Sequence, residues 1–358
     1  MNLKRLSRHG WTAWSTLALL TAAACSDDPV QPDVSVDLEA LFASPTASEV
    51  DAISSEWAAR ASGAVGTTVE RDTTVTSGGI DIRVRIVSHQ VLGVRHYGAV
   101  LSAADLADPA PVLMYAHPGD EGAAVEDVLL QLSVTGDLAA GFVWIVPSFR
   151  SEQLRFAGSS WTSEGPSSFL DRDVDDAMGL LDVALEIEPL ADPDRVGVLG
   201  FSRGAGVALL MGARDQRVDR IVGFSGLTDF FDVYIQDVVE EALAGSPRDL
   251  PGLDELNERF IQPLARGEIS VDAMRVELVR RSVVQYADDL PMVQIHHGID
   301  DDVVDVSQAN SLISTMEALG RGEPDFEGYL YAGGTHNPFT LAGSFPLAVS
   351  YLAALSNP

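Results

Sequence analysis

Lysine and cysteine are almost missing from this sequence: Lys4 is the single lysine and Cys25 the single cysteine among 358 residues. One cysteine cannot close a disulfide within the chain, so a disulfide scaffold is excluded. Basic residues of any kind are scarce, since 23 Lys and Arg face 53 Asp and Glu, for a formal net charge of −30. Such a surface repels phosphate backbones, and we expect no nucleic-acid partner. An ordinary soluble acidic surface and adaptation to a saline medium both fit this charge.

The N-terminal stretch is first basic and then apolar. Lys4, Arg5 and Arg8 precede "WTAWSTLALLTAAA", which is too short to span a bilayer as a stable helix but typical of a signal peptide. The following "LTAAAC" resembles the lipobox of bacterial lipoproteins, and this resemblance implies lipid attachment at Cys25. We expect a signal peptide over residues 1–24, export to the cell envelope, and membrane contact only through that anchor. A plain secretory signal with an incidental cysteine, giving a periplasmic or secreted protein, is the alternative.

Residues 25–66 are expected to hold a tether and short helices. The tether, "SDDPVQPDVSVD", is acidic and almost free of large apolar side chains, which favours a flexible linker. The next segment, 37–61, carries apolar residues at helical spacing and is divided by Pro45. It therefore predicts two short helices.

Two kinds of apolar pattern follow. Three alternating runs predict antiparallel strands at 68–76, 80–89 and 94–101. Near-continuous apolar runs, typical of parallel strands buried on both faces, then occur at 111–117, 141–147, 195–201, 220–226 and 292–297. Because helical segments separate these runs, the sequence predicts a doubly wound, mostly parallel α/β fold with antiparallel N-terminal strands.

Two of the connecting segments stand out. Residues 169–187 predict a helix with an apolar stripe and its acidic residues on the opposite face. The segment 227–287 is about sixty residues long, where a crossover of about a dozen would suffice, and it contains two amphipathic helical patterns. We expect it to form a helical cap above the carboxyl ends of the strands.

The stretch "RVGVLGFSRGAG" contains a Gly-x-Ser-x-Gly pentapeptide, Gly200 to Gly204. Such a pentapeptide also arises by chance, but here it lies between a buried strand and a predicted helix, which is the context of a nucleophile elbow. Its small residues let strand and helix approach each other closely. A purely structural glycine turn needs no serine at its apex, so we expect Ser202 to be a nucleophile.

A serine needs a base, and in this kind of site the chain order is serine, acid, histidine. His336 lies after the serine, on a Gly-rich loop that follows the last predicted strand, and is the expected base. His296 and His297 are adjacent on a strand and point to opposite faces, which disfavours a shared metal ion. Candidate acids after that strand are Asp300, Asp301, Asp302 and Asp305. Spacing alone does not choose between Asp301 and Asp302.

Four segments together resemble the α/β-hydrolases, specifically the prolyl-oligopeptidase-like catalytic domain. "DPDRVGVLGFSRGAG" looks like its elbow, "HHGIDDDVV" is similar to its acid motif, "GGTH" matches the region of its histidine, and "MYAHPGDEG" resembles its oxyanion-hole loop. The resemblance implies an α/β-hydrolase catalytic domain over 67–358. It also implies Asp301, four residues after His297, as the acid.

Two departures from the family pattern matter. The family's "HGG" is His117-Pro118-Gly119 here, and proline has no N–H to donate. We therefore expect the oxyanion hole to use the backbone N–H of Arg203 with one from Gly119 or Asp120. "VPSFRSEQL" resembles its family counterpart only loosely, which leaves the role of Arg150 open.

The expected function is that of an exported serine hydrolase that acts through Ser202, Asp301 and His336 and needs no cofactor or metal. Only about 85 residues of the mature chain precede the oxyanion-hole loop, too few for the propeller of the large peptidases, so the cap would select the substrate. A small-molecule ester and a peptide both remain open as substrates. The alternative is a catalytically inactive hydrolase fold that serves as a binding protein at the cell envelope.

Overall fold

The computed structural model describes residues 36–135 and 140–356. The chain divides into two units, Met1–Asp33 and Val34–Pro358. The predicted signal peptide, Cys25 and most of the predicted tether lie outside the described residues. Within the described ranges, no helix combines the length and the apolar character that a membrane span requires.

The alternating runs form three antiparallel strands, as predicted: β1 (Val65–Ser77), β2 (Ile80–Val91) and β3 (Val94–Ala103). Gly78 and Gly79 form the turn between the first two, and both have positive φ, which glycine adopts without strain. β3 then pairs antiparallel with β6 (Val143–Pro147), the edge strand of the parallel part of the sheet.

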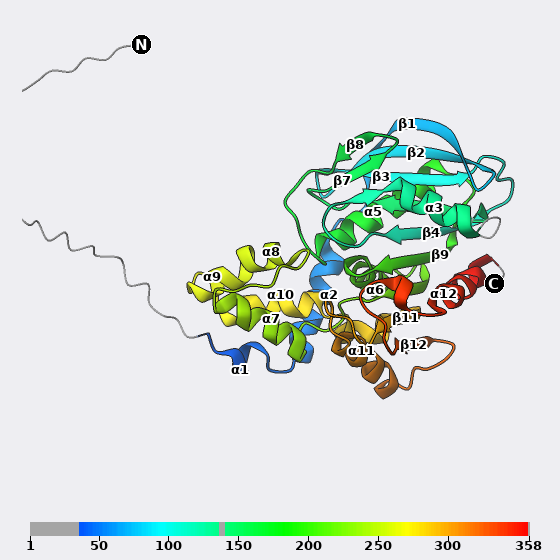
Figure 1. The fold of residues 1–358 in the computed structure, drawn as a ribbon. Helices are drawn as coiled ribbons and strands as arrows, with labels where there is room; N and C mark the ends of the chain where they lie inside the picture. Colours follow the sequence, from blue (N-terminus) through cyan, green and yellow to red (C-terminus); the bar gives the residue numbers. More distant parts are fainter. Residues whose placement is uncertain (1–35, 136–139, 357–358) are drawn as a thin grey trace, which may run out of the picture. The chain divides into compact units, whose positions relative to one another are not determined.

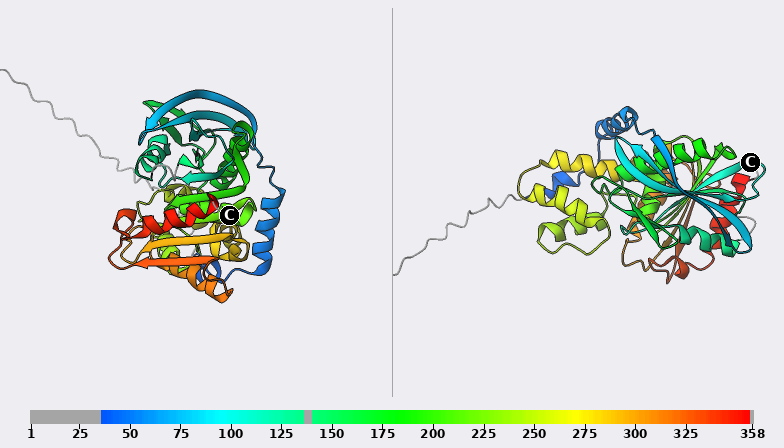
Figure 2. Two further views of the ribbon diagram at one scale, coloured as in Figure 1. Left: turned by 90° about the vertical axis from the view of Figure 1, so that its right-hand side faces the viewer. Right: turned by 90° about the horizontal axis from the view of Figure 1, so that it is seen from above.

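The near-continuous apolar runs form the parallel part of a nine-stranded sheet (Figure 1). Its strands are β4 (Ala110–Ala116), β6 (Val143–Pro147), β9 (Ala191–Phe201), β10 (Val218–Phe224), β11 (Met292–Gly298) and β12 (Phe326–Tyr331). The strand order is β1-β2-β3-β6-β4-β9-β10-β11-β12, and the sheet twists, as Figure 2 shows from above. The chain runs outward from β4 in both directions, so the carboxyl ends of β4 and β9 form the crevice where α/β sheets bind ligands. A second, three-stranded sheet contains β5 (Ala123–Ala124), β7 (Gln153–Phe156) and β8 (Ser159–Thr162).

Helices cover both faces of the large sheet and enclose two apolar cores. On one face lie α3 (Val125–Thr135) and α12 (Ser344–Ala353), with short 3-10 turns at Pro338–Thr340 and Ala354–Ser356. On the other lie α5 (Arg172–Ile187), α6 (Arg203–Arg214) and α11 (Ser307–Ala318). The strand residues alternate between the two cores, because successive side chains of a strand point to opposite faces.

Three of the acidic residues that the sequence places opposite the apolar stripe of α5 are not exposed to solvent. Asp173, Asp175 and Asp176 are all buried, and arginines from other segments neutralise them. Asp176 accepts two side-chain hydrogen bonds from Arg150, and Asp175 pairs with Arg214. A buried carboxylate is tolerated only when it is paired in this way. Helical periodicity shows where charged residues lie around a helix, but it does not show which oppositely charged residues of distant segments will pair with them.

The long insertion between β10 and β11 is helical, as predicted. It contains α7 (Val233–Leu243), α8 (Leu253–Leu256), a π-helical turn (Asn257–Ile261), α9 (Gln262–Ala265), α10 (Val271–Arg281) and a 3-10 segment (Val283–Asp289). These helices lie beyond the carboxyl ends of β4 and β9 (Figure 1). We call residues 227–287 the cap.

The two predicted N-terminal helices, α1 (Leu38–Leu41) and α2 (Ala47–Ala59), pack on the cap. Arg275 of α10 donates hydrogen bonds to the carbonyls of Ala40, Leu41 and Ala43 and pairs with Glu49. The N-terminal helices therefore brace the cap from outside.

Candidate active site

Ser202 stands at a sharp turn between β9 and α6. Its backbone has φ 51° and ψ −119°, a region that non-glycine residues rarely adopt. Two backbone hydrogen bonds hold the turn: Ser202 N–H donates to Phe224 O at 2.7 Å, and Ser202 O accepts from Ala205 N–H at 2.9 Å. The turn therefore presents the serine at the carboxyl edge of the sheet.

Glycines on either side of the serine make this turn sterically feasible. A Cβ at Gly204 would lie 2.0 Å from the carbonyl oxygen of Ala116, and one at Gly200 would lie 2.3 Å from the carbonyl oxygen of Gly204. The first turn of α6 consequently rests directly on the end of β4. Ser202 is thereby fixed beside the loop that follows that strand.

The structure brings Ser202, His336 and Asp301 into one hydrogen-bonded chain. Ser202 Oγ lies 3.0 Å from His336 Nε2, and His336 Nδ1 lies 2.9 Å from Asp301 Oδ2. Asp301 follows β11 and His336 follows β12, two strands that pair in parallel. The two loops are also joined directly, since Asp300 N–H donates to Gly334 O at 2.9 Å.

Asp301 is held as an ionised acceptor. Its Oδ1 accepts hydrogen bonds from the backbone N–H groups of Val303 (3.0 Å) and Val304 (2.9 Å). Burial alone would raise the pKa of Asp301, but these amides and His336 outweigh it and hold the pKa below its usual range. Asp302 is exposed. The geometry thus selects Asp301 from the two aspartates that spacing alone could not separate.

The adjacent histidines of β11 have separate surroundings. His297 Nε2 donates to Val304 O at 2.8 Å and lies 3.4 Å from Asp301 Oδ2. His296 stacks on Phe224 and forms hydrogen bonds with Tyr331 and Gln294. Among the residues that the structure describes, no group of three or more His, Cys, Asp and Glu side chains could hold a metal ion.

The side chain of Arg203 ties the elbow to the loop after β4. It is buried, donates to Gly119 O at 3.1 Å, and forms ion pairs with Glu152 and Asp173. Its guanidinium also lies 5.1 Å from the ring centroid of Phe149. The sequence pointed to the backbone of this residue and missed its side chain. No local signal could have revealed it, because its partners come from distant segments.

The expected oxyanion-hole residues come from two segments, the start of α6 and the loop after β4. The N–H of Arg203 opens α6, and the first N–H groups of a helix have no acceptor within the helix. Gly119 follows Pro118 and has φ +68°. Asp120 Oδ2 accepts from Gly252 N–H of the cap at 3.3 Å, so this loop also contacts the cap.

His117 is buried beneath that loop. Its Nδ1 lies 3.1 Å from Pro118 O, its ring lies 4.6 Å from that of Phe149, and its Nε2 faces Glu152 Oε2 at 3.3 Å. Burial, opposed by Arg203, raises the pKa of Glu152 to about 7. These contacts connect His117 to the loop after β4 and to Glu152, and they brace that loop.

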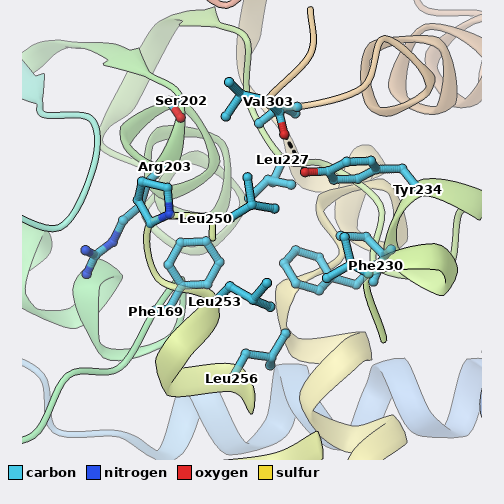
Figure 3. Close-up of a pocket in the computed structure, with 14 residues that line it drawn as sticks. Phe169, Ser202, Arg203, Leu227, Phe230, Tyr234, Leu250, Leu253, Leu256 and Val303 are labelled. Carbon is cyan, nitrogen blue, oxygen red and sulfur yellow. Dashed lines mark hydrogen bonds between the residues drawn. The ribbon is translucent and has the colours of Figure 1, made fainter. Parts of the chain in front are cut away.

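Two cavities meet at Ser202. The one under the cap has a volume of about 50 Å³ and is lined by Arg203 as well as the serine. Figure 3 shows apolar side chains around it, among them Phe169, Leu227, Phe230, Leu253 and Leu256. The other, of about 740 Å³, lies on the sheet face covered by α3 and α12 and is lined by both Ser202 and His336.

No protein-family model and no curated protein sequence matches the chain significantly. Solved structures do. Acetyl xylan esterase 1 from Thermoanaerobacterium sp. JW/SL YS485 is 18% identical, with a TM-score of 0.62 over 89% of this chain and 98% of that one. Acetyl xylan esterase from Paenibacillus sp. R4 is 15% identical, with a TM-score of 0.55 over 90% and 96%.

A third similar structure is the acylaminoacyl peptidase of Pyrococcus horikoshii, 15% identical with a TM-score of 0.50. It covers 78% of this chain, while this chain covers only 40% of the peptidase. Likenesses at such identities establish the fold. The chain has the α/β-hydrolase fold, as predicted.

Proposed function

We propose that this protein is a serine hydrolase that cleaves a carboxylic ester through an acyl-enzyme on Ser202. The hydrogen-bonded chain from Ser202 through His336 to Asp301 is the observation that carries the proposal. A serine at a strained strand-to-helix turn, next to a histidine oriented by a buried carboxylate, is the arrangement that activates a hydroxyl for acyl transfer.

In the first step Ser202 Oγ attacks the acyl carbon while His336 Nε2 accepts the hydroxyl proton. Asp301 holds the Nδ1–H tautomer and stabilises the imidazolium that forms. The negative charge that develops on the carbonyl oxygen is stabilised by the N–H of Arg203 and by an N–H of Gly119 or Asp120.

In the second step His336 returns its proton to the leaving oxygen, and the alcohol departs. Water then attacks the acyl-enzyme with His336 again as general base, and Ser202 is regenerated. The low pKa of Asp301 suits this cycle, because the carboxylate stays charged while the imidazole gains and loses its proton.

Two considerations favour an ester over a peptide. An alkoxide or phenoxide leaves more readily than an amine, so ester cleavage makes smaller demands on the general acid. This chain also spans 98% and 96% of the two acetyl xylan esterases but only 40% of the acylaminoacyl peptidase. A catalytically inactive binding protein, the alternative, would not need the serine, histidine and carboxylate in one hydrogen-bonded chain.

The decisive experiment is Ser202→Ala with p-nitrophenyl acetate and a fluorophosphonate probe. We expect labelling and hydrolysis in the native protein, and the loss of both in the variant with unchanged thermal unfolding. Ser151→Ala is the matched control, because Ser151 also has a positive φ of 66° but is exposed and lines neither cavity. Equal activity in Ser202→Ala, or no labelling of the native protein, would refute the proposal.

We further propose that the protein is exported and anchored through a lipid on Cys25, on the basis of the N-terminal sequence alone. In a bacterial host supplied with a labelled fatty acid, the native chain should take up label and stay with membranes. Cys25→Ala should take up none and appear in the soluble fraction. An unlabelled native chain would instead favour the plain secretory signal.

A further inference from the structure

The larger cavity beside the proposed triad is apolar along almost its whole length. Its floor is the face of the sheet that carries Leu113, Tyr115, Leu199 and Phe224, and its sides are formed by α3 and α12. A volume of about 740 Å³ is within the range of pockets that enclose a small-molecule ligand. Protein interiors are closely packed and rarely contain voids much larger than a water molecule. A void of this size beside the nucleophile therefore does not serve the packing of the fold.

The cavity extends from the serine backwards along the strands. Leu113 lines it and is aligned with Gly197, which precedes Phe201 by four residues. At about 3.3 Å per residue, the lined region covers roughly 13 Å along the sheet. This shape suits an extended or aromatic group better than a compact one.

Large apolar side chains are exposed near its walls. Leu130 of α3 is 64% exposed and Phe339 of the loop after His336 is 82% exposed, and both line the cavity. Exposed apolar side chains that line a hollow are available to an apolar ligand. We expect both to contact an apolar group that enters the cavity.

The two cavities lie beside different groups of the bound substrate. In the tetrahedral intermediate the oxyanion points to the N–H of Arg203, while the leaving oxygen must lie beside His336 Nε2 to receive its proton. The large cavity is lined by His336 and the small one by Arg203, and Ser202 lines both. The leaving group therefore belongs in the large cavity and the acyl group in the small one.

The sizes add a second restriction. The cap-side cavity, of about 50 Å³, is far smaller than the cavity of about 740 Å³ between α3 and α12. This difference favours a small acyl group such as acetyl on the cap side. Its walls belong largely to the cap, whose ion pairs with α2 hold it in position.

We propose that this site cleaves short-chain acyl esters, acetates above all, of apolar alcohols whose alkyl chain or aromatic ring lies in the cavity between α3 and α12. This inference rests on the proposed hydrolase function. It makes the leaving group, rather than the acyl group, the part of the substrate that the enzyme recognises by apolar burial.

Two series of esters test which cavity binds the alcohol and which binds the acyl group. Across ethyl, hexyl and decyl acetate, kcat/KM should rise by up to about fourfold for each buried methylene. Across p-nitrophenyl acetate, butyrate and octanoate, it should fall more than tenfold beyond butyrate. The assignment would be overturned if kcat/KM rose with the length of the acyl chain and did not depend on the alcohol. It would also be overturned if kcat/KM did not change with chain length in either series.

Val349→Phe tests the cavity itself. Val349 is half-buried on α12 and lines the cavity, whereas the neighbouring Leu347 is exposed and does not. Val349→Phe should lower kcat/KM for decyl acetate at least tenfold and leave ethyl acetate within twofold of the native value. Leu347→Phe, the matched control, should change neither. Equal effects of Val349→Phe on both esters would count against the cavity as the binding site.

If Val349→Phe fails to fold, Phe339→Ala replaces it, since that ring is exposed and its loss opens no core. It should also reduce the preference for decyl acetate over ethyl acetate. The hydrolase proposal is judged separately. If Ser202 is labelled by the fluorophosphonate but kcat/KM does not change with chain length, only the cavity inference is refuted. If Ser202 is not labelled, the hydrolase proposal is refuted as well.

Discussion

Arg203 has two distinct tasks in the proposed mechanism, and the structure separates them. Its backbone N–H is a proposed donor to the oxyanion, while its guanidinium donates a hydrogen bond to Gly119 O. Glu152 and Asp173 keep the guanidinium in place. Through this bridge the side chain makes Arg203 a positioning residue for the very loop expected to supply the second donor.

Arg203→Lys should therefore lower kcat by about tenfold to hundredfold with little change in KM, because oxyanion donors act mainly in the transition state. Lysine keeps the charge and loses the planar fork that reaches three partners at once. Kinetics with p-nitrophenyl acetate, read beside thermal unfolding, provide the measurement.

The control for this variant is Arg150→Lys, since Arg150 is also buried but pairs with Asp176 and not with the loop. It should lower stability while leaving kcat nearly intact. A folded Arg203→Lys enzyme with native kcat would show that the bridge is structural only.

At the scale of elements, the proposed site depends on three loops at one edge of the sheet. The elbow follows β9, the Asp301 loop follows β11 and the His336 loop follows β12. Close packing holds the last two together: a Cβ at Gly298 would lie 2.3 Å from Gly334 O. Parallel strands of one sheet thus bring together Ser202 and His336, which are 134 positions apart in the chain.

The elbow was predictable from sequence because everything that forms it is local. A buried strand, a serine flanked by glycines and a helix all fall within residues 195–214, and the order of acid and histidine after it limited the partners. The cap was predictable for a similar reason, since the excess length and the helical periodicity of 227–287 are local features.

The paired acids of α5 and the large cavity could not be predicted in the same way. Asp173 faces an arginine 30 residues away, so its burial depends on tertiary packing and not on helical periodicity. The cavity is lined from four strands, two helices and several loops, and an unfilled volume leaves no mark in any one of them. Sequence patterns report which side chains are apolar, but not where their packing leaves space.

At the scale of the whole molecule, the excess of acid at the surface coexists with a charged interior. Buried carboxylates meet buried arginines around α5, and burial raises the pKa of Asp176 to about 6 and, against Arg203, that of Glu152 to about 7. Each of these two acids favours the folded state more as the pH falls, because its folded pKa lies above the unfolded value.

Buried histidines act in the opposite direction, and His296 isolates the effect because burial alone lowers its pKa to about 4. A folded pKa below the unfolded value of about 6.5 gives stability that is present above pH 6.5 and lost as the pH falls toward 4. Between pH 7.5 and pH 5 the native protein should lose about 2 kcal/mol of unfolding free energy through this residue. His296→Gln should be less stable at pH 7.5 yet lose correspondingly less on acidification, as measured by urea unfolding at both pH values. An identical pH dependence in protein and variant would mean that His296 is protonated as easily in the folded state as in the unfolded one.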